Sequence, residues 1–148
     1  MKLREHDKQA LQIIATNKSV GGRYYDFEAL LEQYGRWSRA GVIPCRVPLS
    51  ATALQEAFCF LDTENILLFV DKVIADLKSV DFNKVNFAAF ELCFLIPDAA
   101  EQDRAEKEML LRKQLKYKKG RFLSAYTKAR EEFQELIRLN LLKLLKEL

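Results

Sequence analysis

Apolar residues recur at intervals of three and four along most of this 148-residue chain, and this spacing limits the folds open to it. The apolar positions between residues 27 and 37 share one face of a helix: Phe27, Leu30, Leu31, Tyr34 and Trp37. No segment has the pattern of a strand ladder. The sequence therefore predicts an all-α protein, a single helical domain with a helix-turn-helix near the C-terminus and a long C-terminal helix.

Proline and helix-capping residues divide the predicted helices into two groups. Residues 1–41 are expected to form an N-terminal helical segment, and residues 42–49, with two prolines, form the only clear loop of any length. Residues 50–148 are expected to form the helical body. Within it, residues 83–96 indicate one largely buried helix that Pro97 ends, and a helix from about Arg121 to Leu148 is the longest in the protein.

The residues that most catalytic and metal sites need are scarce. His6 is the only histidine and has no partner at motif spacing, so a Ser-His-Asp or Cys-His arrangement is not expected. Cys45, Cys59 and Cys93 are odd in number and never form C-x-x-C, which argues against a zinc ribbon and against a disulfide framework. No glycine loop that could cradle phosphate is present. We expect no enzyme activity, no metal and no cofactor.

The hydropathy pattern indicates a protein of the reducing cytoplasm that does not insert into a membrane. The first residues, MKLREHDKQA, do not have the pattern of a signal peptide, and the longest apolar runs are short. The leucine-rich run at residues 136–148 could lie on a membrane surface, but it has no interfacial aromatic residue. Packing on the core of the protein or on a partner helix is the favoured interpretation.

The positive charge of the chain is concentrated in its last third. Residues 1–100 hold 11 Lys and Arg against 13 Asp and Glu, whereas residues 101–148 hold 13 against 8. Residues 112–130 hold eight basic residues and no acidic one, with three aromatic residues between them. A solvated helix face could carry such lysines, but the absence of acidic residues and the aromatic spacing favour contact with nucleic acid.

The same stretch has the pattern of a helix-turn-helix at about residues 98–137. In that motif apolar residues let two helices cross steeply while the second helix keeps one face free for the major groove. The residues that fit the buried places are Leu111, Leu115, Tyr117, Phe122 and Tyr126. Ala125 is predicted to face outward. The residues predicted to bind double-stranded DNA are Lys118, Lys119, Arg121, Ser124, Lys128, Arg112 and Lys116.

A second group of basic residues surrounds the single tryptophan. Arg36 and Arg39 flank Trp37 in the predicted helix that follows Asp26. In one interpretation Trp37 belongs to the core and the arginines are solvated. In the other interpretation the three residues form a patch for phosphate or for a protein partner.

Two short stretches resemble known families. Residues 115–137, LKYKKGRFLSAYTKAREEFQELI, are similar to the helix-turn-helix in the fourth region of bacterial sigma factors. This chain departs from that pattern at Arg112, where a small residue is usual, and at Lys116, which replaces the turn glycine. Residues 30–38, LLEQYGRWS, resemble the opening of phage late-gene antitermination proteins of the Q type that lack a zinc motif.

The Q-type resemblance implies a particular activity. Such a protein binds DNA at a phage late promoter, loads onto the paused host RNA polymerase and suppresses termination. The polymerase could carry its sigma factor at that stage, and the location is the host cytoplasm. The resemblance places DNA on the basic stretch and RNA polymerase on Arg36, Trp37 and Arg39. The alternatives are an inhibitor that acts through protein–protein contact only and a plain DNA-binding repressor.

Overall fold

The computed structural model describes residues 3–18, 21–40, 63–95, 101–115 and 122–147. Every regular element in these ranges is helical, which confirms the all-α prediction. The predicted loop at residues 42–49 lies outside the described residues. The elements are α1 (Glu5–Thr16), α2 (Tyr25–Ala40), α4 (Thr63–Lys78), the 3-10 turn η1 (Asp81–Asn83), α5 (Lys84–Phe90), the π-helical segment η2 (Glu91–Leu95), α6 (Glu101–Leu115) and α7 (Phe122–Glu147).

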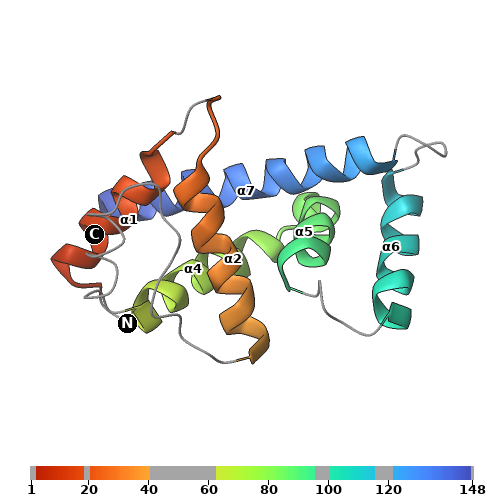
Figure 1. Ribbon diagram of the computed structural model, residues 1–148, viewed down its shortest axis with the longest axis horizontal. Coiled ribbons are helices and arrows are strands. Elements are labelled where there is room, and N and C mark those ends of the chain that lie inside the picture. The colour runs from red at the N-terminus through yellow and green to blue at the C-terminus, as the bar shows by residue number, and fades with distance from the viewer. Residues whose placement is uncertain (1–2, 19–20, 41–62, 96–100, 116–121, 148) are drawn as a thin grey trace.

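The long helix α7 runs along the longest axis of the molecule, and the other helices are arranged along it (Figure 1). α6 stands at one end of α7 and points away from it, while α1 lies near the other end. α2, α4 and α5 occupy the space between them. α7 contacts α5, α4, α1 and α6, so it is the element that joins the parts of the fold. The predicted long C-terminal helix is thus confirmed.

One line of buried side chains explains how α7 contacts so many partners. The line contains every fourth residue: Ala125, Ala129, Phe133, Ile137 and Leu141. An α-helix turns by about 100° per residue, so each step of four residues passes a full turn by about 40°. The buried line therefore winds around α7 and faces different neighbours at its two ends.

The main core draws on both ends of the chain. Phe90 lies 5.2 Å from Phe133 and 5.0 Å from Phe94, measured between ring centroids, and Phe87 lies 5.5 Å from Phe133. Offset and edge-on aromatic pairs at these distances add to the stabilisation from apolar burial. Side chains of α1 and α2 enter the same cluster. The N-terminal helices therefore share one core with the helical body.

The predicted buried helix at residues 83–96 is wrong in one respect, because the described part is not one continuous α-helix. It begins as a 3-10 turn and widens into the π-helical segment η2 after Phe90. At η2 the backbone of α2 comes so close that a Cβ atom on Gly35 would overlap the carbonyl oxygen of Phe94. Arg39 Nη1 donates a hydrogen bond of 2.5 Å to that same oxygen. Tertiary contact with α2 thus accompanies the change in helix type.

A hydrogen bond between a phenol and a carboxylate links α2 to α4. The Tyr34 hydroxyl donates to Asp71 Oδ1 at 2.6 Å, and the Tyr34 side chain is buried. Burial, followed by the bond to Asp71, raises the pKa of Tyr34 well above its ordinary value. Folding therefore favours the neutral phenol.

This shift predicts a loss of stability in alkaline solution. The stabilisation is complete below the pKa of the unfolded tyrosine, near 10, and is lost as the pH rises toward the higher pKa of the folded protein. Above pH 10 the free energy of unfolding is expected to fall by up to about 1.4 kcal/mol per pH unit from this group. Tyr34→Phe is expected to remove that component and to cost about 1 kcal/mol at pH 7. Denaturant unfolding at several pH values measures the free energy of unfolding of both proteins. If it fell equally steeply above pH 10 in the Tyr34→Phe variant and in the unchanged protein, the alkaline loss would not come from Tyr34.

Candidate nucleic-acid interface

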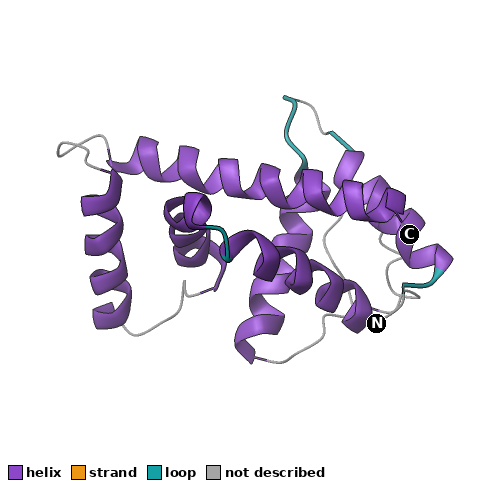
Figure 2. Ribbon diagram, turned by 180° about the vertical axis from the view of Figure 1, so that it is seen from behind, coloured by secondary structure: helices purple, strands orange, loops and turns teal. Residues whose placement is uncertain are grey.

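The predicted helix-turn-helix corresponds to α6, α7 and the segment between them. α6 ends at Leu115 and α7 begins at Phe122. Seen from both sides, α6 stands at a steep angle to α7 (Figures 1 and 2). A second apolar cluster, separate from the main core, holds the two helices against α5 and η2. Its buried members are Ala89, Leu92, Leu111 and Ala129, and the partly buried side chains around them are Val85, Ala88, Leu115 and Tyr126.

Three of the five residues predicted to be buried in the motif have described side chains. Leu111 is fully buried, as predicted. Leu115 and Tyr126 are partly buried and pack against the second cluster, so they also lie where the pattern placed them. Tyr117 and the side chain of Phe122 lie outside the described part of the chain. Within the described part, the apolar contact between the two helices is therefore the predicted one.

Three of the predicted DNA-binding residues are described, and all three are exposed: Arg112, Ser124 and Lys128. Arg112 Nη2 also pairs with Glu108 Oε1 at 3.1 Å. The prediction that Ala125 faces outward is wrong, because Ala125 is buried and begins the buried line of α7. The other predicted residues lie outside the described part of the chain: Lys116, Lys118, Lys119 and Arg121.

The face of α7 that carries Ser124 and Lys128 changes charge along its length. Steps of four and three residues keep side chains on one helical face, and Ser124, Lys128, Glu131, Glu135 and Arg138 follow these steps. Glu131 is exposed, and Glu135 is bound to Arg138. Between Ser124 and Arg138 the exposed cation of this face therefore lies at the beginning of α7, because Arg138 is buried and paired with Glu135.

The structure places the predicted partner-binding residues on α2, away from the junction of α6 and α7. Arg36 is exposed, and it makes no ion pair within the described residues. Trp37 is partly buried, with its ring 6.0 Å from that of Tyr34, at the edge of the main core. Arg39 is held by the carbonyl of Phe94. Of the two arginines, Arg36 is the one that is exposed without a hydrogen bond or ion pair in the described part of the chain.

The sequence did not single out a polar group in the middle of α7. Arg138 is 9% exposed, and its guanidinium carbon lies 3.9 Å from the centre of the Tyr24 ring. Arg138 Nη1 donates to the carbonyl of Ala15 at 3.2 Å, and hydrogen bonding to Glu135 raises the pKa of the guanidinium. The only sequence signal was spacing, which places these side chains on one face. Spacing alone does not distinguish a buried arginine from a solvated one.

The described residues do not form a metal site or a membrane-spanning helix. No three His, Cys, Asp or Glu side chains gather there in a way that could hold a metal ion. None of the helices described is both long and apolar enough to cross a membrane. No protein-family model, curated protein or solved structure matches this chain. The resemblance to Q-type antiterminators therefore stays a prediction.

Two adjacent leucines of α6 test the orientation of the interface. Leu111 is completely buried in the second cluster, whereas its neighbour Leu110 is 61% exposed. Leu111→Ala is expected to lower the free energy of unfolding by about 2 to 5 kcal/mol, because it leaves a cavity. Leu110→Ala is expected to change it by less than about 0.5 kcal/mol. Denaturant titrations of both variants measure the difference; similar losses would mean that α6 is turned differently about its axis.

Proposed function

We propose that this protein is a transcription regulator that binds double-stranded DNA through the junction of α6 and α7. The observation that carries the proposal is the exposure of Arg112, Ser124 and Lys128 where two steeply crossed helices meet. The second apolar cluster supports both helices there, so these side chains are presented by packed elements. Steeply crossed helices with one polar face free are the geometry that enters the major groove.

Charge supports the same proposal. Lys113, at the end of α6, is exposed beside Arg112. The segment between the helices adds Lys116, Lys118, Lys119 and Arg121 in sequence, without any acidic residue. Each lysine or arginine that neutralises a phosphate releases a counterion, and this release supplies much of the affinity for DNA. Lysines are proposed to hold the backbone, whereas Ser124 is placed to meet a base edge or a phosphate.

Salt dependence tests the proposal directly. With about four to six phosphate contacts, the logarithm of the affinity is expected to fall against the logarithm of the salt concentration with a slope of roughly −4 to −5. Lys128→Glu is expected to reduce the slope by about one and to weaken binding to all sequences by about tenfold. Fluorescence anisotropy with labelled duplexes at several salt concentrations measures both effects.

The matched control uses another exposed lysine of the same helix. Lys143 lies 15 residues after Lys128, about 22 Å along the axis of α7, and is also exposed. Lys143→Glu changes the net charge by the same amount as Lys128→Glu. Because Lys143 lies outside the proposed contact, this substitution is expected to leave the slope unchanged. Equal effects of the two substitutions would point to general attraction, not to a contact at the junction. No binding to any duplex at low salt would favour the alternative, an inhibitor that acts through protein contact alone.

The more specific form of the proposal is antitermination at a phage late promoter. It is supported by the resemblance of residues 30–38 and 115–137 to Q-type and sigma-factor sequences, and by the exposed charge of Arg36 on α2, a different element from the DNA-binding junction. An antiterminator needs two such surfaces, because it binds a DNA element and also modifies a polymerase that has left that element. RNA polymerase is the proposed partner of α2.

In vitro transcription tests the two surfaces separately. A duplex element selected from random sequences is placed at a promoter with an early pause and a downstream intrinsic terminator. The protein is expected to raise readthrough, and Lys128→Glu is expected to lower it by preventing loading. Arg36→Glu is expected to keep DNA affinity and lose readthrough, whereas Lys143→Glu keeps both. Promoter binding that only represses transcription would leave a plain DNA-binding repressor.

A further inference from the structure

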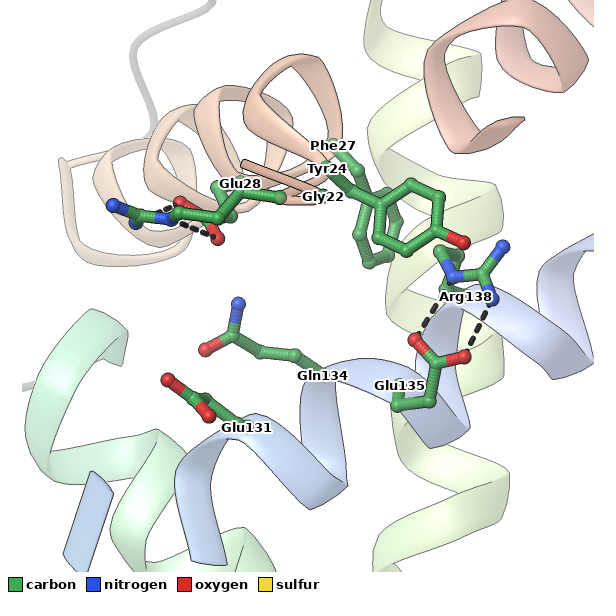
Figure 3. Close-up of a pocket in the computed structure, with 9 residues that line it drawn as sticks. Gly22, Tyr24, Phe27, Glu28, Glu131, Gln134, Glu135 and Arg138 are labelled. Atoms are coloured by element: carbon green, nitrogen blue, oxygen red, sulfur yellow. Dashed lines mark hydrogen bonds and ion pairs between the residues drawn. The ribbon is translucent and has the colours of Figure 1, made fainter. Parts of the chain in front are cut away.

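A cavity of about 220 Å³ opens to solvent between the beginning of α2 and the middle of α7 (Figure 3). It is smaller than the pockets of about 300 to 1,000 Å³ that hold drug-sized ligands. At about 30 Å³ for each water molecule, it has room for roughly seven waters or for one small organic group. The cavity lies outside the proposed DNA contact, since Arg112, Ser124 and Lys128 do not line it.

The cavity contains a hydrogen-bond donor that the protein itself does not use. Gln134 is only 7% exposed, and its side-chain oxygen accepts a hydrogen bond of 2.7 Å from Arg130 Nη1. This bond fixes the orientation of the amide, so that the oxygen faces Arg130 and the nitrogen faces the cavity (Figure 3). The amide nitrogen has no hydrogen-bond partner within the described residues. A ligand that offers an acceptor oxygen would satisfy it.

One carboxylate at the cavity makes no direct ion pair. Arg23 Nη2 pairs with Glu28 at 2.6 Å, and Arg138 Nη2 pairs with Glu135 at 2.5 Å. Glu131 makes no ion pair or hydrogen bond within the described residues, and its charge acts on Arg23 only through space, where it helps to raise the pKa of the guanidinium. Two arginines and three glutamates line the cavity, so its lining has a net charge of −1. A cationic ligand is the electrostatic complement of this lining.

The apolar wall of the cavity is held in place. Both Arg138, at 3.9 Å, and Lys18, at 5.3 Å, lie over the Tyr24 ring, and such cation–π contacts fix its orientation. Phe27 lies behind it and is almost completely buried. These rings offer apolar contact to a small side chain, while the polar groups of α7 face the cavity from the other side (Figure 3).

We propose that this cavity binds a primary ammonium group with a carbonyl group beside it, as in an amino-acid amide or the N-terminal residue of a peptide. The ammonium would bind the carboxylate of Glu131, and the carbonyl oxygen would accept a hydrogen bond from the Gln134 amide. Residues three apart on a helix have Cβ atoms about 5 to 6 Å apart, which suits two groups joined by one carbon. The ligand carries one positive charge and so matches the lining better than a zwitterionic amino acid does.

Calorimetric titration of the full chain tests this proposal with three small probes. Leucinamide is expected to bind saturably with a Kd on the order of 1 mM, as its small size allows. N-acetylleucinamide, which lacks the ammonium, is expected not to bind. Leucine separates the two sources of the ligand: weaker binding than leucinamide assigns the site to peptide N-termini and amides, and tighter binding assigns it to free amino acids.

Two neighbouring glutamates provide matched variants. Glu131→Gln is expected to weaken leucinamide about tenfold, the loss of one charge-assisted hydrogen bond. Glu132→Gln removes the same charge from an exposed residue that does not line the cavity, so affinity is expected to stay unchanged. Gln134→Leu is expected to abolish binding, with the thermal transition of the free protein as a check on folding. Equal affinity of Glu131→Gln and the unchanged protein, equal binding of N-acetylleucinamide, or no saturation at about 50 mM overturns the proposal.

Discussion

The buried line along α7 is the constraint on which the rest of the structure depends. At the beginning of the helix its members are Ala125 and Ala129, and in the middle it presents Phe133. Small residues leave room for α5 and α6 to approach the helix, whereas Phe133 fills the space between Phe87 and Phe90. Each step of four residues turns the buried line further around the helix axis. The same helix therefore packs against two apolar clusters that lie on different sides of it. Stability and the position of the candidate DNA surface therefore depend on the same helix.

Much of the helical fold could be predicted, because helical periodicity is a local property of the sequence. The long helix was expected from about Arg121 and begins at Phe122, and the buried place of Leu111 was also foreseen. Ala125 was not, because its environment depends on the helices that pack beside α7 and not on its immediate neighbours. The π-helical form of η2 was missed for a related reason: it accompanies the close approach of Gly35, which is far away in sequence.

Of the two candidate sites, one could be predicted from the sequence and the other could not. A run of basic residues without acidic ones is visible in composition, so the candidate DNA surface could be predicted from sequence. The cavity could not, since it is built by contacts between distant segments. No sequence pattern marks Arg138 as a structural residue. Its role comes from tertiary contacts, because it stacks on Tyr24 and donates a hydrogen bond to the carbonyl of Ala15. Arg39 was likewise predicted to bind a partner, whereas in the folded chain its guanidinium donates a hydrogen bond to the carbonyl of Phe94.

The charge on one face of α7 changes from positive to negative at a boundary between Lys128 and Glu131. Lys128 and Glu131 are three residues apart, so the sign reverses over about 4.5 Å of the axis. Double-stranded DNA carries a negative charge about every 1.7 Å of its length, and it would be repelled if it lay along the helix past this point. Under the proposed function, a duplex would therefore meet α7 near its N-terminal end and would not lie along it. A cation held at Glu131 would cancel the first carboxylate beyond the boundary, and occupancy of the cavity would in this way alter the field that an approaching phosphate meets.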